Sequence, residues 1–231
     1  MNASRSGLLL LLSLSLLFSA GACAQEQSVR PGVNAYYQDP EFSTWVRRFE
    51  SAGREVYDLR EAIVHASGVG PGMSVADVGA GTGLFTLLFA SRVGNAGRVY
   101  AVDISETFVR EVEARARTQG AGNVAGVVSE PRDAGLPSSA LDLVFVCDTY
   151  HHFEYPQDML RSIHDALRPD GTLVVIDYRK VAGTSSQWVM GHVRAGKDTV
   201  IREIQAEGFR LIEDNPMLRD NFLLRFRKEP R

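Results

Sequence analysis

Two features of the sequence predict an α/β fold with a doubly wound, mostly parallel sheet. The first is an alternation of strand-like and helix-like segments, which begins near Met73 and continues to the last residues. The second is a glycine-rich loop, Asp77 to Gly83, that follows the first strand of the series and opens its first helix. Strands that alternate with helices form βαβ units, in which the strands run parallel.

Seven strands are expected, each a short run of apolar or β-branched residues. They cover residues 74–78, 98–102, 124–128, 141–147, 172–177, 209–213 and 221–227. Apolar residues at helical spacing predict helices over residues 83–93, 107–119, 156–167 and 199–207. The connection between the last two strands, around Pro216, is too short for a helix. These two strands are therefore expected to form an antiparallel C-terminal hairpin.

The segment before the sheet is expected to hold a lead-in and one helix, residues 25–67, in front of a single domain over residues 68–231. Residues 25–44 are polar and contain prolines, whereas residues 42–67 have apolar side chains at helical spacing. The aromatic residues Tyr36, Tyr37, Trp45 and Phe49 favour a helix packed on the sheet over a cover for a substrate. Gly68, Gly70 and Gly72 end the helix.

Residues 1–24 have the pattern of a secretory signal peptide. Arg5 precedes a leucine-rich run, which is shorter than a membrane span and is followed by small residues. Ala22-Cys23-Ala24 fits cleavage before Gln25, whereas Ala20-Gly21-Ala22-Cys23 resembles a lipoprotein signal that ends before Cys23. The protein is therefore expected to be exported, periplasmic or secreted, with membrane attachment only if Cys23 carries a lipid.

The composition is that of an ordinary globular protein and predicts no nucleic-acid partner. The formal net charge is -3, with acidic and basic residues well mixed, so the sequence lacks the basic face that nucleic acids require. Cys147 would be the only thiol in the domain and lies in an apolar run, which favours a small buried hydrophobe over a nucleophile.

The loop Asp77-Val78-Gly79-Ala80-Gly81-Thr82-Gly83 predicts a ligand site. Glycines let the backbone turn tightly and approach a ligand, and the helix that follows offers free N–H groups. The spacing is G-x-G-x-G, and Leu84 stands where a dinucleotide-binding loop has its third glycine. Asp77 suits a cationic ligand better than a pyrophosphate. This argues against a nicotinamide oxidoreductase, which remains the weaker alternative.

Acidic residues follow the next two strands, where ligands of open α/β sheets bind. Asp103 ends the second strand, 20 residues beyond Gly83, a position typical of an acid that accepts from ribose hydroxyls. Glu130 follows the third strand and is a candidate acceptor for an adenine amino group, with Asp133 as its rival.

These motifs, together with His164-Asp-Ala-Leu-Arg-Pro-Asp-Gly-Thr-Leu-Val-Val-Ile-Asp177, resemble the class I SAM-dependent methyltransferases. The likeness covers about residues 61–228 and is greatest to small-molecule enzymes related to ubiquinone and menaquinone C-methyltransferases. It implies a Rossmann-like fold and S-adenosyl-L-methionine (SAM) as the cofactor. Gly79, Gly81 and Gly83 would lie against SAM, Asp77 near its cationic end, and Asp103 on its ribose.

The resemblance further implies that SAM and a small-molecule acceptor meet where the fourth strand ends. Asp148 is expected on the cofactor side, and Tyr150, His151 and His152 are candidates to orient the acceptor or remove its proton. His192 is a weaker candidate, in a segment where such families build a lid. No metal is expected, because the histidines show no metal-ligand spacing. A second alternative is an exported protein that binds its ligand without catalysis.

Overall fold

A computed structural model describes residues 25–231. The expected signal peptide, with its two cleavage patterns and Cys23, lies outside the described residues. Within residues 25–231, no helix combines the length and the apolar character that crossing a membrane requires.

The fold is a seven-stranded sheet with the strand order β3-β2-β1-β4-β5-β7-β6. The strands are β1 (Ser74–Val78), β2 (Arg98–Asp103), β3 (Val124–Val128), β4 (Leu141–Cys147), β5 (Leu167–Tyr178), β6 (Phe209–Asn215) and β7 (Asn221–Lys228). The first five are parallel, whereas β7 lies antiparallel between β5 and β6. The predicted α/β class, the mostly parallel sheet and the antiparallel hairpin are confirmed.

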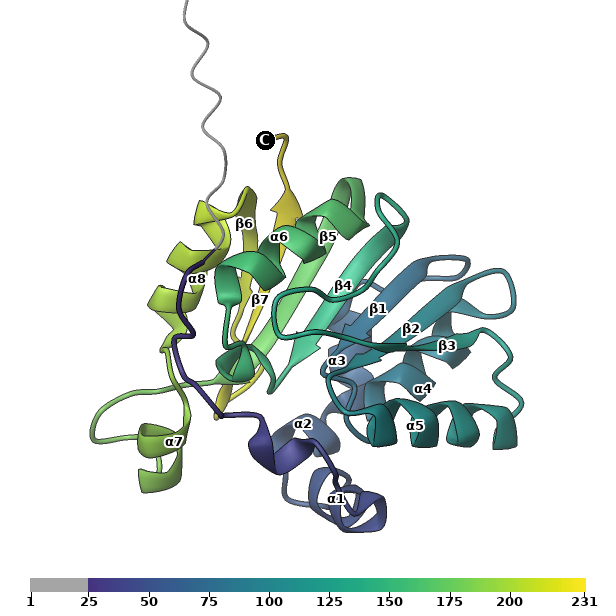
Figure 1. Ribbon diagram of the computed structural model, residues 1–231, viewed down its shortest axis with the longest axis horizontal. Coiled ribbons are helices and arrows are strands. Elements are labelled where there is room, and N and C mark those ends of the chain that lie inside the picture. The colour runs from purple at the N-terminus through teal and green to yellow at the C-terminus, as the bar shows by residue number, and fades with distance from the viewer. Residues whose placement is uncertain (1–24) are drawn as a thin grey trace, which may run out of the picture.

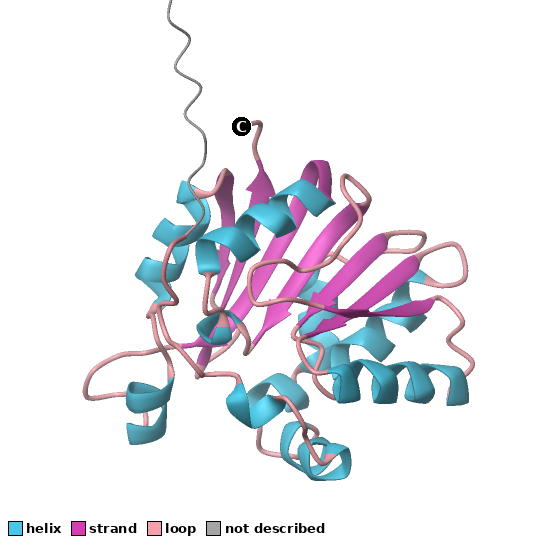
Figure 2. Ribbon diagram, in the orientation of Figure 1, coloured by secondary structure: helices cyan, strands magenta, loops and turns pink. Residues whose placement is uncertain are grey.

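Helices cover both faces of the sheet and make three layers (Figure 1). In the view of Figures 1 and 2, α6 (Pro156–Ala166) and α8 (Lys197–Ala206) lie in front, and α3 (Arg60–Ser67) and α4 (Leu84–Val93) lie behind. The longest helix, α5 (Glu106–Thr118), packs on β2 and β3. The remaining helices, α1 (Phe42–Phe49), α2 (Glu55–Asp58) and α7 (Gln187–His192), lie beyond the edge at which the parallel strands end.

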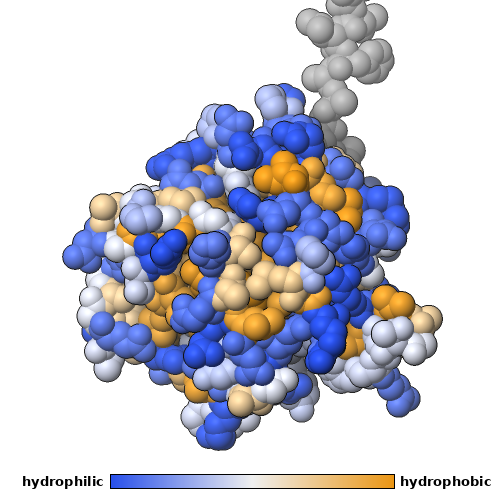
Figure 3. All heavy atoms as spheres, turned by 180° about the vertical axis from the view of Figure 1, so that it is seen from behind, coloured by the Kyte–Doolittle hydropathy of each residue, from blue (hydrophilic) through white to orange (hydrophobic). Residues whose placement is uncertain are grey.

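Side chains that alternate along the central strands form a separate core on each face. Val144 and Val146 of β4 pack in the front core with α6 and α8, whereas Leu143 and Phe145 pack in the rear core with α3 and α4. A strand buried on both faces has a continuous apolar sequence, as Leu141–Cys147 does except at Asp142. Seen from behind, hydrophilic residues surround the apolar residues that reach the surface (Figure 3).

Three segments differ from the sequence-based expectation. The single helix expected over residues 42–67 is three, because the chain turns at Gly53, with φ of 92°, and again at Leu59. Strand β5 begins earlier than expected: Leu167 pairs with Leu141, and pairing resumes from Thr172 after an irregularity. Helix α7 was not expected from the sequence.

A substitution at Phe145 tests how much the rear core contributes to the stability of the fold. Its side chain has no solvent exposure, and its ring centre lies 4.9 Å from those of Phe85 and Phe89. Replacing a buried phenylalanine with alanine removes apolar contact and leaves a cavity, so Phe145→Ala should lower the free energy of unfolding by about 3–5 kcal/mol. Denaturant unfolding measures this. Tyr36→Ala, at an aromatic side chain that is 84% exposed, is the control and should change stability by less than about 0.5 kcal/mol.

Candidate active site

A cavity of about 390 Å³ opens at the carboxyl ends of β1, β2 and β4. This is where an open α/β sheet binds ligands, and the volume suits a small molecule. One wall is the glycine-rich loop with the ends of β2 and β3. The rest of the lining, called the second wall below, consists of aromatic, histidine and arginine side chains from the N-terminal segment, the ends of β4 and β5, and α7. They are Tyr37, Arg48, Phe49, Arg54, His151, His152, Tyr178, Trp188 and His192. Phe49 of this set lies against Gly81.

At two positions of the loop, both the backbone conformation and the neighbouring side chains require glycine. Gly79 has φ of +77°, and a Cβ there would lie 2.2 Å from the side chain of Thr149. Gly83 has φ of +82°, caps α4, and would place a Cβ 2.8 Å from Val112. The loop therefore packs closely against α5 and the segment that follows β4, and Gly79 and Gly81 also line the cavity.

Asp77 is buried beneath the loop, at the floor of the cavity. It is 3% exposed, and its Oδ2 accepts a hydrogen bond of 2.7 Å from the hydroxyl of Thr86. Burial raises the pKa of Asp77 to about 7, against the lowering effect of the Thr86 hydrogen bonds. The carboxyl group is consequently costly to ionise unless a cation lies nearby.

Asp103 links the end of β2 to the glycine-rich loop. Its Oδ2 accepts from the backbone N–H of Gly81 at 2.9 Å, and its Oδ1 accepts from the N–H of Ser105 at 2.9 Å. Burial raises the pKa of Asp103 to about 6, and the backbone hydrogen bonds oppose that rise. The side chain lines the cavity, and each carboxylate oxygen has a further lone pair to offer a ligand.

The two acidic residues that follow β3, Glu130 and Asp133, differ in their position relative to the cavity. Glu130 is exposed and lines the cavity. Asp133 faces away from it, because its Oδ1 accepts from the Ser162 hydroxyl at 2.7 Å and from the N–H of Gly135 at 2.9 Å. The hydrogen bonds from Ser162 and Gly135 lower the pKa of Asp133. The geometry favours Glu130 over its rival.

Asp148 lines the cavity with both of its oxygens already hydrogen-bonded. Oδ2 accepts from Arg54 at 2.6 Å and Oδ1 from Asn221 at 2.6 Å. Its backbone has φ of 49°, which a non-glycine residue adopts only where the surroundings hold it. Burial raises the pKa of Asp148, and the nearby charge of Arg54 opposes this. Neither Arg54 nor Asn221 stood out in the sequence, because each is distant from Asp148 along the chain.

His151 is held by Asp177 at the end of β5. Its Nδ1 lies 2.8 Å from Asp177 Oδ1, and its backbone N–H donates to Oδ2 at 3.0 Å. Both side chains are buried, yet His151 lines the cavity. A carboxylate that fixes Nδ1 orients the ring and leaves Nε2 available for chemistry. Asp177 was part of the sequence motif, but its pairing with His151 was not foreseen.

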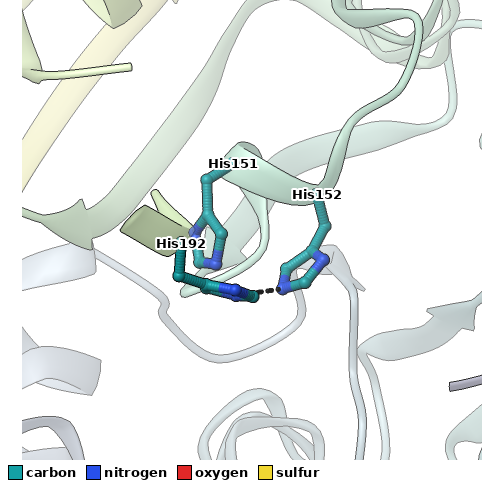
Figure 4. A group of neighbouring side chains, drawn as sticks. All are labelled: His151, His152 and His192. Atoms are coloured by element: carbon teal, nitrogen blue, oxygen red, sulfur yellow. Dashed lines mark hydrogen bonds between the residues drawn. The ribbon is translucent and has the colours of Figure 1, made fainter. Parts of the chain in front are cut away.

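His152 and His192 complete a group of three imidazoles with His151 (Figure 4). The Nε2 atoms of His152 and His192 lie 3.4 Å apart. Burial lowers the pKa of His152 to about 3 and that of His192 to about 4, and the electrostatic effect of the nearby His151 is the second cause. Both are therefore neutral near pH 7. The sequence ranked His192 as the weaker candidate, because nothing local shows that α7 brings it to the end of β4.

For Tyr150 and for the N-terminal aromatic residues, the structure differs from the sequence-based prediction. Tyr150, a predicted catalytic residue, is fully buried and is not among the residues that line the cavity. Its hydroxyl donates to Glu203 Oε2 at 2.8 Å, so the geometry favours a structural role. The helix that carries Trp45 packs on α5 and not on the sheet as expected: Trp45 is buried beside Phe108, whereas Tyr37 and Phe49 line the cavity.

The burial of Asp77 predicts a pH-dependent stability. Because its folded pKa is about 7 and its ordinary value is 3.8, the folded protein retains a proton that the unfolded chain loses between these values. The contribution of Asp77 to stability is therefore expected to fall as the pH rises from about 4 to about 7. Asp77→Asn, an uncharged group of the same shape, should raise the melting temperature by several degrees at about pH 8 and leave it nearly unchanged at about pH 4. Thermal unfolding of both proteins at the two pH values checks this, and equal melting temperatures at pH 8 would contradict it.

Comparison with known proteins connects this geometry to a family. Residues 76–175 match the family model described as a methyltransferase domain. Over 119 residues the chain is 34% identical to the ubiquinone/menaquinone biosynthesis C-methyltransferase UbiE of Hydrogenovibrio crunogenus. The matched region covers 51% of this chain and 47% of that relative. UbiE of Ectopseudomonas mendocina is also 34% identical, over 51% of this chain and 46% of its own length. The chain thus spans about half the length of these curated relatives.

Several solved structures resemble this chain in fold although their sequence identity to it is low. A SAM-dependent methyltransferase from Aquifex aeolicus matches with a TM-score of 0.72 and 24% identity, over 80% of this chain and 97% of that one. The [4+2]-cyclase SpnF matches with a TM-score of 0.65 and 18% identity, over 78% and 85%. Residues 76–175 thus match a methyltransferase domain, and the chain shares its fold with the solved SAM-dependent methyltransferase.

Proposed function

We propose that this protein transfers the methyl group of SAM to a small-molecule acceptor by in-line displacement. The observation that carries the proposal is that one cavity is lined by two chemically different sets of residues, the glycine-rich loop with Asp103 and His151 with its neighbours. A cofactor on the first wall and an acceptor against the second would meet inside the same cavity. Holding two reactants in line accounts for much of such catalysis.

SAM is proposed to lie along the first wall. Gly79, Gly81 and Gly83 let the backbone approach it, and Asp103 accepts from its ribose hydroxyls while its hydrogen bonds to Gly81 and Ser105 fix the carboxylate. Asp77 lies beneath, where the positive charges of SAM would favour its ionised form. Glu130 would accept from the adenine amino group. Asp148 joins this wall to the second, because Arg54 and Asn221 hold it at the end of β4.

The acceptor is proposed to lie against the second wall. His151, oriented by Asp177, presents Nε2 toward the cavity and takes the proton of the acceptor atom. The acceptor's electron pair then forms the bond to the methyl carbon, and the electrons of the breaking carbon–sulfur bond return to sulfur. Tyr37, Phe49, Tyr178 and Trp188 supply apolar, aromatic contacts, which favour a planar organic acceptor. The relatives named as ubiquinone and menaquinone methyltransferases support a small molecule.

The N-terminal pattern supports the further proposal that the protein is exported. Residues 1–24 combine an early arginine, a short leucine-rich run and small residues before Gln25. Labelling cells with a radioactive fatty acid and sequencing the N-terminus of the mature protein would distinguish cleavage before Gln25 from lipid attachment at Cys23.

Asp103→Ala should weaken SAM binding about tenfold or more, because it removes a charged hydrogen-bond acceptor worth about 1.5–3 kcal/mol. Calorimetric titration with SAM and with its demethylated product measures the affinities. Asp133→Ala, at the neighbouring acid that faces away from the cavity, is the matched control and should bind SAM as the unmodified protein does. Unchanged affinity in Asp103→Ala would refute the placement of the ribose. Binding of NADH in place of SAM would support the oxidoreductase alternative.

His151→Asn should abolish most methyl transfer and leave SAM affinity unchanged. The asparagine amide nitrogen can replace Nδ1 as a donor to Asp177, so the variant lacks only Nε2. A loss of about 10²–10⁴-fold in rate is typical for a proton-transfer group. The assay is transfer of labelled methyl from SAM to a panel of phenols, thiols and amines. His65→Asn, on the exposed side of α3, is the control. SAM binding without transfer to any acceptor would favour the non-catalytic alternative.

A further inference from the structure

We propose that His151, His152 and His192 together bind one divalent transition-metal ion, with zinc as the representative ion, on the acceptor side of the cavity. One ring nitrogen from each histidine lies within 4.8 Å of the other two. The rings come from two separate segments, η2 (Tyr150–His152) and α7, and point toward one another (Figure 4). Imidazole is a preferred ligand for zinc, copper, nickel and iron.

The spacing of two of the nitrogens matches a metal site better than a hydrogen bond. The Nε2 atoms of His152 and His192 are 3.4 Å apart. Hydrogen bonds donated by N–H groups are usually shorter, about 2.7–3.2 Å. Two nitrogens bound to one tetrahedral zinc are separated by about 3.3–3.4 Å, given zinc–nitrogen bonds of about 2.0–2.1 Å. A metal between these rings would therefore need little movement of either one.

Asp177 provides the outer support that metal-binding histidines usually have. Its Oδ1 lies 2.8 Å from Nδ1 of His151, which leaves Nε2 as the nitrogen available to a metal. A carboxylate on the second nitrogen orients the ring and makes it a stronger ligand. Asp177 also supplies a negative charge against the positive charge of the ion. Two nearby positive charges oppose binding: Arg30, whose guanidinium donates to the carbonyl of His192, and Arg48, which lines the same cavity.

The other two rings are fixed by aromatic neighbours. Trp188 stacks on His192 with ring centres 4.5 Å apart and an interplanar angle of 20°, and Tyr37 meets His152 edge-on at 5.0 Å. Nδ1 of His152 is buried and has no hydrogen-bond partner among the described residues. Within residues 25–231, the ring nitrogens of His152 and His192 form hydrogen bonds only with each other. Two partly buried imidazoles that face each other in this way have ring nitrogens available to a further ligand.

Three protein ligands beside a cavity leave a coordination position for another molecule, as in catalytic zinc sites. Its use in catalysis rests on the proposed function. A hydroxyl or thiol of the acceptor bound there would lose its proton to solvent more readily, and its electron pair would then attack the methyl carbon of SAM. In the metal-loaded protein, the ion replaces His151 as the group that activates the acceptor.

Zinc titration without SAM tests the site independently of methyl transfer. The protein, expressed without a polyhistidine tag and stripped with a chelator, is titrated with zinc by calorimetry and with cobalt by visible absorption. We expect one ion per chain and the intense cobalt absorption of a four-coordinate site. His152→Ala and His192→Ala should each weaken zinc binding at least tenfold, and Asp177→Asn should weaken it by about 10–100-fold.

His65→Ala is the matched control, because His65 lies on the exposed face of α3, outside the group of three. Circular dichroism of each variant verifies folding, and His192, on the partly exposed α7, is the substitution least disruptive to the core. The proposal is overturned if the folded protein binds no zinc, or if His192→Ala and His65→Ala bind it equally. A SAM titration of the same sample tests the proposed function separately, so failure of one leaves the other standing.

Discussion

The site depends on carboxylates that are buried where the strands end and satisfied by groups from other elements. Asp103 ties the loop after β1 to the end of β2 through the N–H of Gly81. Asp148 ties the end of β4 to Arg54, which precedes α2, and to Asn221, the first residue of β7. Asp177 ties β5 to the turn that carries His151. Buried carboxyl groups are unfavourable unless such partners are present, so each acid specifies how two or three segments meet.

These links explain why the two walls of the cavity differ. The first wall is built from the glycine-rich loop, whose backbone can approach a ligand closely, and from the acidic side chains of Asp103 and Glu130. The second is built from rings whose orientations are set by Asp177, Tyr37 and Trp188. The first arrangement is common to proteins of this fold and says little about the reaction. The similarity to the [4+2]-cyclase SpnF illustrates the point, because a shared fold does not fix the chemistry performed on it.

The sequence predicted most of the sheet, because buried strands and glycine turns have local signals. Residues 74–78, 124–128 and 141–147 were placed with the bounds that the structure has. It also indicated the acids at the ends of β1, β2 and β4, which lie in continuous motifs. It could not indicate Arg54, Asn221 or the pairing of His151 with Asp177, because these contacts join residues far apart in the chain. Nor could it show that Tyr150, next to two cavity residues, turns into the core toward Glu203.

The position of β7 between β5 and β6 affects when the active site can form. Asn221 supplies a hydrogen bond to Asp148, 73 residues earlier, and β7 completes the sheet on both of its sides. A nascent chain that has not yet reached residues 221–228 therefore lacks both an interior strand of the sheet and a hydrogen-bond partner of the cavity residue Asp148. Such a topology delays folding until nearly all of this sequence has left the ribosome. Late folding would keep the chain competent for passage through a translocation channel, which requires an extended polypeptide, and it fits the export proposed for this protein.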